Sequence, residues 1–160
     1  MPINPQETIY YKRARFTTRL PLGRMYDRSH FWRLEMEPDL YRVGLTKFAT
    51  RMLGDLVEVD FQAKVGDPVT FGQVLGTIEG FKAVSELYSM MEGEFAGLNT
   101  DLMNDPTLLD SDPYDAGWLY LIRGTAGETS LDVQGYIALL DATVDRMLEQ
   151  QGSESKGKPC

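Results

Sequence analysis

The sequence predicts a small, mainly β fold, closed or arranged in two layers, with helices at its periphery. Short runs of β-branched or alternating apolar residues recur along residues 41–123, and turns containing Gly or Pro separate them. Sustained helical periodicity begins late, at Ser130. A chain of 160 residues suits one compact domain with tails.

The earliest elements of this fold carry clear boundary signals. An extended run ends at Gly44, and Thr46 then caps a short helix, Lys47–Leu53, which Gly54 closes. β-Branched residues in alternation predict a strand over Leu56–Phe61. A helix followed directly by a strand is therefore expected in this part of the chain.

A β-hairpin is predicted in the middle of the chain. Its first strand covers Val74–Ile78, the turn covers Glu79–Lys82, and Ala83–Ser89 returns as the second strand. Gly80 permits the positive φ that a tight hairpin tip often needs. This arrangement predicts Lys82 at or beside an exposed tip.

The alternative to the returning strand of the hairpin is a helix over residues 81–91, where several residues favour helix. The elements on either side of the hairpin are predicted from turn residues and composition. Turns are expected at 65–68 and 92–94, short helical turns at 99–109, and a strong strand at 118–123.

The chain divides into four predicted segments. A basic extension covers residues 1–28 and the main β domain covers 29–128. An amphipathic helix covers 129–151, and a flexible polar tail covers 152–160. The helix prediction rests on apolar residues at three- to four-residue spacing, which are Val133, Ile137, Leu140, Val144 and Leu148.

The net charge of −8 is distributed unevenly. Residues 1–51 hold ten Lys and Arg against five Asp and Glu, whereas residues 52–160 hold six against nineteen. The acidic part repels phosphate, which argues against nucleic acid and for basic docking faces on protein partners. Residues 10–24 are basic and partly match an organelle transit peptide, but Glu7 favours an extension that packs on the domain or a partner.

Cysteine and histidine are nearly absent from the sequence. The single Cys160 excludes an intrachain disulfide, and the single His30 excludes catalysis by two imidazoles and histidine-rich metal sites. A reducing, cytoplasmic location is the simplest interpretation. No run approaches the roughly 18 apolar residues of a membrane helix, so no membrane partner is expected.

Lys82 is the main candidate for a chemically modified residue. Between residues 54 and 122 the basic side chains are Lys64 and Lys82 alone, so an amine at an acidic hairpin tip is easily singled out by a modifying enzyme. The alternative from spacing alone is an ordinary solvated turn lysine.

The run from Gly44 to Arg123 resembles the glycine cleavage H protein family, which is related to the biotinyl and lipoyl domains. Ser29–Arg33 also fits the entry strand of the family. The matching pieces, in chain order, are Gly44-Leu45-Thr46, Leu53-Gly54-Asp55, Val57-Glu58-Val59, Val65-Gly66-Asp67, Ile78-Glu79, Lys82-Ala83, Glu86–Ser89, Gly93-Glu94, Asn99, Pro106–Leu109 and Asp112–Leu119.

This resemblance implies a flattened β-barrel or sandwich hybrid and a non-catalytic carrier with lipoic acid in amide linkage on Lys82. It implies that a lipoate-attaching enzyme reads Glu79, three places before the lysine, together with Gly80. His30 and Phe81 are candidates for contact with the lipoyl arm, although a lone histidine beside aromatic residues is more often structural. A long arm carries a group between active sites, and its two sulfurs supply the redox chemistry.

Three departures from the family pattern bear on the pathway. Ordinary H proteins typically have a small or polar residue and then valine between the acid and the lysine, where this chain has Gly80-Phe81. The basic N-terminal stretch is longer, and the C-terminal helix and tail extend further. Changed docking surfaces favour a related branch, the lipoate-binding proteins of sulfur-oxidising prokaryotes, which serve a heterodisulfide-reductase-like complex.

Two other functions remain open from the sequence. One is an orthodox H protein that carries the aminomethyl group among glycine decarboxylase, aminomethyltransferase and dihydrolipoyl dehydrogenase. The other is an unmodified interaction module that has kept the fold. The intact mass separates this last possibility from the two lipoyl carriers.

Overall fold

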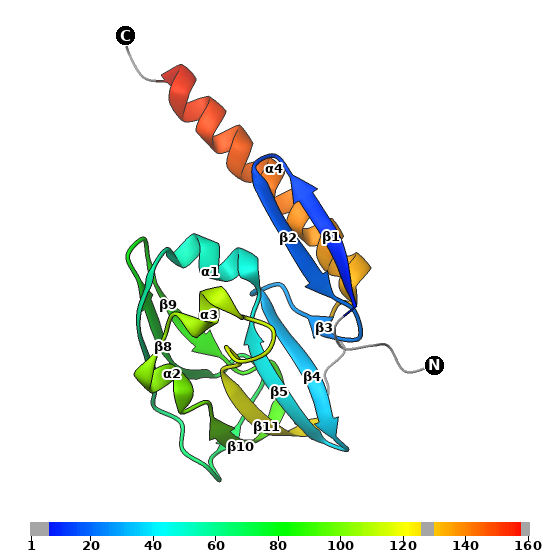
Figure 1. Ribbon diagram of the computed structural model, residues 1–160, viewed down its shortest axis with the longest axis vertical. Coiled ribbons are helices and arrows are strands. Elements are labelled where there is room, and N and C mark those ends of the chain that lie inside the picture. Colours follow the sequence, from blue (N-terminus) through cyan, green and yellow to red (C-terminus); the bar gives the residue numbers. More distant parts are fainter. Residues whose placement is uncertain (1–6, 126–129, 158–160) are drawn as a thin grey trace.

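The computed structural model describes residues 7–125 and 130–157, with side chains described as far as residue 151. Figure 1 shows a β-rich body and, beside it, a hairpin packed along a long C-terminal helix. The elements in chain order are β1 (Thr8–Arg13), β2 (Phe16–Pro21), β3 (Met25–Tyr26), β4 (Phe31–Glu37), β5 (Leu40–Leu45), α1 (Lys47–Leu53), β6 (Leu56–Phe61), β7 (Pro68–Val69), β8 (Val74–Gly80), β9 (Val84–Tyr88), β10 (Glu92–Leu98), α2 (Asp101–Asn104), α3 (Leu108–Ser111), β11 (Tyr120–Thr125) and α4 (Val133–Gly157).

The strands form three antiparallel sheets. The largest has six strands in the order β3-β4-β5-β11-β10-β7, the second has the order β6-β8-β9, and β1 pairs with β2 alone. The two larger sheets face each other, with short helices at one side and α4 at the end of the chain (Figure 1). The predicted mainly β fold, with short peripheral helices and a C-terminal helix, is confirmed.

The main hydrophobic core lies where the two larger sheets meet. Leu75 and Ile78 enter it from the three-stranded sheet, and Phe95 and Ile122 enter it from the six-stranded sheet, each at most 1% exposed. Burial of such side chains contributes roughly 1.5–3 kcal/mol each. This core fixes the base of the β8–β9 hairpin while its tip projects beyond it.

Helix α1 has the boundaries that the sequence predicted. The Thr46 hydroxyl accepts a hydrogen bond from the Ala49 amide at 3.4 Å, and Gly54 ends the helix with φ 79°. Its buried residues face two directions, because Leu53 belongs to the main core and Phe48 belongs to a second cluster. The helix therefore joins two parts of the molecule.

The second hydrophobic cluster lies on the opposite face of β4. Because strand side chains alternate between faces, Phe31 enters the main core and Trp32 enters the second cluster. Tyr26 from β3 and Tyr136 from α4 stack within this cluster, with ring centroids 4.7 Å apart. The terminal segments β1, β2 and α4 are held to the body in this way.

The predicted returning strand is confirmed as β9, so the alternative helix over 81–91 does not form. Two other expectations are wrong. Residues 92–94 are not a turn but the start of β10, where Gly93 pairs with Gly124 and a Cβ on Gly93 would lie 2.1 Å from the Arg123 carbonyl oxygen. Helix α4 continues to Gly157, so most of the tail expected at 152–160 is helical. Residues 126–129 and 158–160 lie outside the described residues.

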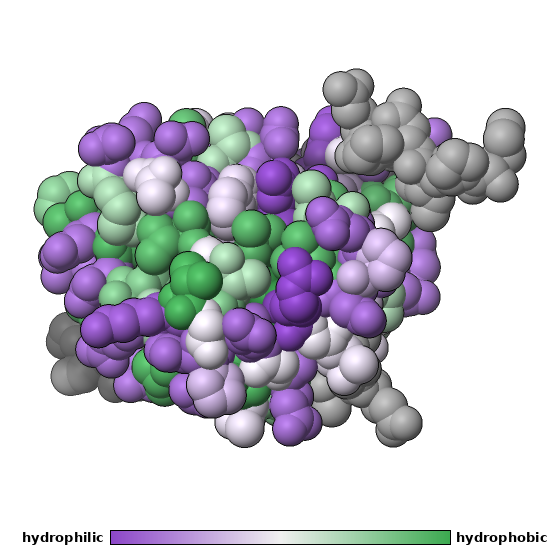
Figure 2. All heavy atoms as spheres, turned by 90° about the horizontal axis from the view of Figure 1, so that it is seen from below, coloured by the Kyte–Doolittle hydropathy of each residue, from purple (hydrophilic) through white to green (hydrophobic). Residues whose placement is uncertain are grey.

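The surface mixes polar and apolar side chains. Figure 2 shows one face on which hydrophobic residues gather at the centre among hydrophilic ones. No helix in the described ranges is long and apolar enough to cross a membrane.

Candidate functional site

Lys82 lies at the tip of the hairpin formed by β8 and β9. The Gly80 amide donates to the Ala83 carbonyl at 2.9 Å, so Phe81 and Lys82 form the turn between them. Lys82 is exposed, and Phe81 is 81% exposed. The structure therefore places this lysine where the sequence predicted.

The hairpin tip is braced against the end of α1 by main-chain hydrogen bonds. The Lys82 amide donates to the Leu53 carbonyl and the Phe81 amide donates to the Asp55 carbonyl, each at 2.9 Å. Carbonyls at the end of a helix have no partner within the helix, and the hairpin supplies one of them with a donor. The backbone of Lys82 is thus fixed while its side chain extends into solvent.

Gly80 has a different role from the one that the sequence suggested. It is not among the residues with positive φ, and it is a buried residue of β8. A Cβ at this position would lie 2.2 Å from the Leu53 carbonyl oxygen. Glycine is required here because α1 and β8 approach closely, and the expectation of a left-handed turn residue was wrong.

Gly54 completes this close approach from the other side. Its φ of 79° favours glycine, and a Cβ there would lie 2.8 Å from Lys82 Cγ. The helix end can therefore pass beside the stem of the lysine. Both glycines allow the main chains to brace the tip.

Glu79 projects from the exposed face of the β6-β8-β9 sheet. It pairs with Val84 on one side and with Glu58 on the other. Asp60 and Glu86 pair with Thr77 in the next position of the same face, so four exposed carboxylates follow the hairpin toward its tip. An enzyme that approaches Lys82 along this face meets negative charge.

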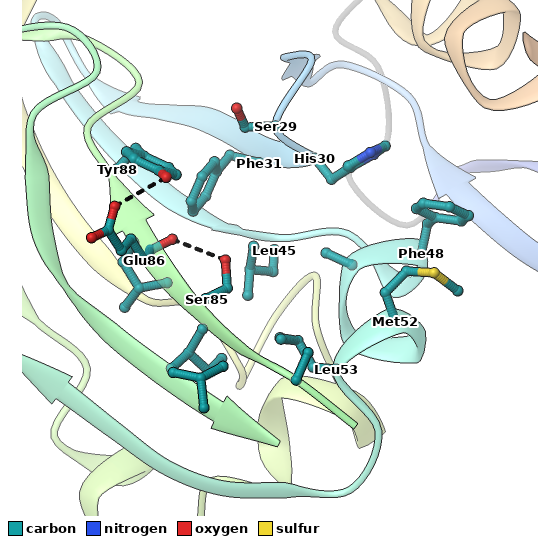
Figure 3. A pocket seen from close by; sticks show the side chains of 15 residues that line it. Ser29, His30, Phe31, Leu45, Phe48, Met52, Leu53, Ser85, Glu86 and Tyr88 are labelled. Atoms are coloured by element: carbon teal, nitrogen blue, oxygen red, sulfur yellow. Dashed lines mark hydrogen bonds between the residues drawn. The ribbon is translucent and has the colours of Figure 1, made fainter. Parts of the chain in front are cut away.

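A cleft of about 350 Å³ opens beside the hairpin. One wall is β9, with Ser85 and Tyr88, and the other is α1, with Phe48 and Met52 (Figure 3). Phe31 lies between the two walls. The lining is mainly apolar and includes Ala83 and Val84, the two residues that follow Lys82.

His30 lies at the edge of this cleft, but its ring is engaged elsewhere. In Figure 3 the imidazole points away from Phe31 and Tyr88. Its Nδ1 lies 2.9 Å from the Tyr136 hydroxyl, and its ring packs on Phe48 with centroids 4.8 Å apart. Burial lowers the pKa of His30 from 6.5 to about 4. The neutral imidazole connects the body to α4.

A polar hollow of about 380 Å³ surrounds the base of Lys82. Phe81 lines this hollow and not the apolar cleft, so the structure separates the two residues expected to contact the arm. Lys47 and Asp110 form an ion pair in it, with Nζ and Oδ1 2.8 Å apart. That hydrogen bond lowers the pKa of Asp110.

Lys47 and Asp110 are not predicted from the sequence as part of this site. They come from α1 and α3 and are distant in the chain, so no local spacing connects them. The bracing carbonyls of Leu53 and Asp55 carry no residue-type signal either. Gly54, as a helix cap before a strand, was the one available indication of a close approach.

An exposed lysine on a braced hairpin, projecting from a two-sheet domain, is the arrangement of a domain that carries a covalently attached group. The family model described as "Glycine cleavage H-protein" matches residues 24–138. The glycine cleavage system H protein of Kocuria rhizophila is 38% identical over 128 residues, which cover 78% of this chain and 99% of that protein. The one from Streptomyces coelicolor is 42% identical over 100 residues, which cover 62% and 79%.

A solved structure agrees with these sequence matches. The crystal structure of a glycine cleavage system H protein from Mycobacterium marinum has a TM-score of 0.68 and 36% identity, and the match covers 74% of this chain and 97% of that one. The chain belongs to the glycine cleavage H-protein family, whose members are non-catalytic carriers of a lipoyl-lysine.

Proposed function

We propose that Lys82 carries lipoic acid in amide linkage and that the chain serves as the H protein of a glycine cleavage system. The observation that carries this proposal is the braced, exposed position of Lys82 within the region that the family model matches. The bound group supplies a dithiol–disulfide pair on a long arm. The protein holds the attachment point and leaves the rest of the arm free to move.

The residues around Lys82 fit such a group. The main-chain bonds to α1 hold the lysine without using its side-chain amine, which stays available for acylation. The apolar cleft begins at Ala83 and Val84, so the aliphatic part of an arm has a surface of matching character close to its attachment point. Exposed Glu79 supplies an acidic feature that a lipoate-attaching enzyme can recognise.

Glycine cleavage is better supported than the sulfur-transfer branch that the changed tip had favoured. The relatives described above are named glycine cleavage system H proteins, and sulfur transfer finds no support among them. The proposed partners are accordingly the lipoate-attaching enzyme, glycine decarboxylase, aminomethyltransferase and dihydrolipoyl dehydrogenase.

The first test is the site of lipoylation. The chain would be produced with a lipoate-attaching enzyme and lipoate, and its intact mass and peptide map would be measured. We expect one lipoyl group on the wild type and on the matched control Lys64→Arg, and none on Lys82→Arg. A lipoyl group retained by Lys82→Arg would contradict the proposed attachment residue.

The second test is the pathway. The lipoylated chain would replace the carrier in a mixture of the three glycine cleavage enzymes, and glycine-dependent release of carbon dioxide would be measured. We expect turnover that depends on Lys82. Transfer of the sulfane sulfur of thiosulfate to one thiol of the dithiol with release of sulfite, together with no glycine turnover, would restore the sulfur-transfer function.

A further inference from the structure

A groove of about 740 Å³ lies next to the apolar cleft and shares Phe48 and Met52 of α1 with it. Its floor is apolar and includes Phe16 of β2, Val144 and Met147 of α4, and Met52 of α1. The turn between β1 and β2 forms one edge. The groove is therefore built where the terminal segments meet the body.

Among the described residues that line this groove, the charged ones are cationic. They are Arg13, Arg15 and Arg51, and no carboxylate lines the groove within the part of the chain whose side chains are described. Arg13 is paired with Asp141 and Asp145 on α4. Arg15 and Arg51 are exposed, and neither forms a salt bridge within the described part of the chain. An apolar floor with a cationic rim thus occurs in a chain of net charge −8.

The groove is continuous with the surroundings of Lys82 through α1. Arg51 lines both the groove and the polar hollow at the base of Lys82. Phe48 and Met52 line both the groove and the apolar cleft. A protein that covers the arm attachment point therefore reaches the groove by crossing a single short helix.

Most of the groove lies outside the part of the chain that the family model matches. Of the eleven described residues that line it, eight come from segments before residue 24 or after residue 138. Most of the described groove lining is thus contributed by the terminal segments, beside the body that the family model matches. An added surface beside a shared attachment site is a means of selecting one partner among several.

Resting on the proposed function, we propose that this groove receives an acidic amphipathic segment of an enzyme that works on the lipoyl arm. The apolar floor matches the apolar side of such a segment, and Arg15 and Arg51 face its carboxylates. Contacts of this kind speed association and select partners, and salt weakens them. Docking in the groove holds the enzyme over Lys82.

Binding would be measured with the full-length, unlipoylated chain and a fluorescent 18-residue peptide of Leu and Glu in amphipathic order. Its twin with Lys in place of Glu is the probe control. Arg15→Glu with Arg51→Glu is the test variant. Lys12→Glu with Arg146→Glu, on β1 and α4, changes the net charge equally at exposed positions outside the described groove lining.

We expect the acidic peptide to bind, the basic twin to bind at least about tenfold more weakly, and the groove variant to lose about tenfold in affinity. The matched variant should keep most of the affinity, and added salt should weaken binding. Equal binding of both peptides, or equal losses in the two variants, would overturn the proposal.

The same groove variant, once lipoylated, would be titrated in the glycine cleavage assay. We expect the carrier concentration for half-maximal rate to rise about tenfold with one enzyme while the maximal rate is unchanged. An unchanged half-maximal concentration with every enzyme would overturn the role in docking. No turnover by the wild type, together with selective peptide binding, would instead refute the glycine cleavage function. The groove would then still stand as a binding site for acidic segments.

Discussion

The lysine hairpin and the terminal segments are attached to the same body by different means. The hairpin tip is held by main-chain hydrogen bonds to Leu53 and Asp55 and by the absence of side chains at Gly54 and Gly80. The terminal segments are held by stacked rings and a hydroxyl of Tyr136 in the second cluster. One attachment depends on close main-chain approach and the other on side-chain packing.

This difference explains how the tip can be both exposed and fixed. Main-chain bonds leave the side chains of Phe81 and Lys82 free to meet other proteins. Side-chain packing would have required those same residues to be buried. The terminal segments use buried side chains such as Tyr136, stacked on Tyr26, for this packing, while Arg15 at the β1–β2 turn stays exposed. We therefore expect substitutions in the two regions to have different consequences for lipoylation and for stability.

The largest effect is expected from Gly80→Val. The added Cβ would lie 2.2 Å from the Leu53 carbonyl oxygen, so α1 and β8 must separate. We expect the free energy of unfolding to fall by about 3 kcal/mol, and the initial rate of lipoylation to fall with it as the brace opens. Denaturant unfolding and intact mass over time would measure both quantities.

Gly72→Ala is the matched control for this substitution. Gly72 has φ 80°, but an added Cβ there would have no atom of the described residues within 4 Å, so the position carries backbone strain without a clash. We expect a loss of about 1 kcal/mol and a normal rate of lipoylation. If the Gly80→Val variant unfolds and is lipoylated like the wild type, the close approach of α1 and β8 does not fix the hairpin tip.

A smaller effect is expected from Tyr136→Phe in the second cluster. The Tyr136 hydroxyl lies 2.7 Å from Thr46 Oγ1 and 2.9 Å from His30 Nδ1, and its removal leaves both atoms without this partner. We expect a loss of about 1–2 kcal/mol with an unchanged rate of lipoylation.

Leu139→Ala, at a half-buried position of the same helix, separates this loss from a general weakening of α4. If the comparison of the two regions is right, neither change on α4 affects acylation of Lys82. A marked fall in the lipoylation rate of Tyr136→Phe would show that the second cluster also supports the hairpin tip.

The sequence predicts these two regions unequally. Helix α1 and the β8–β9 hairpin have local signals, namely a Thr46 cap, a Gly54 stop and alternating strand residues. The β1–β2 hairpin was not predicted, because its turn residues are Ala14 and Arg15 and Ala14 adopts φ 54° without the usual Gly or Asn. Residues 152–157 contain no apolar residue, so periodicity could not extend α4 through them.

The candidate site shows a similar division. Lys82, its exposure and its tip position follow from local pattern and resemblance. The reason for Gly80 does not, because a close approach between β8 and Leu53 depends on packing between elements. The Lys47–Asp110 pair likewise requires α1 and α3 to meet. Contacts between elements far apart in the chain leave no spacing that a single sequence reveals.

The smallest expected effect is a pH dependence of stability that originates at His30. Burial lowers the pKa of this side chain in the folded protein to about 4, below the ordinary value of 6.5. Above pH 6.5 the imidazole is neutral in both states. As the pH falls from 6.5 through 4, the unfolded state binds the proton more readily, so the free energy of unfolding decreases.

We expect His30 to account for a loss of about 1 kcal/mol between pH 6.5 and pH 5, after allowance for its partial exposure. His30→Asn is the appropriate variant, because Asn tolerates the φ of 69° at this position and has no charge to gain. Burial raises the pKa of nearby Asp27, which favours the folded state as the pH falls and opposes the histidine effect. Asp27 is present in both proteins, so the difference between their unfolding curves isolates His30. Parallel pH profiles for the two proteins would show that the imidazole connecting the body to α4 is not the titrating group.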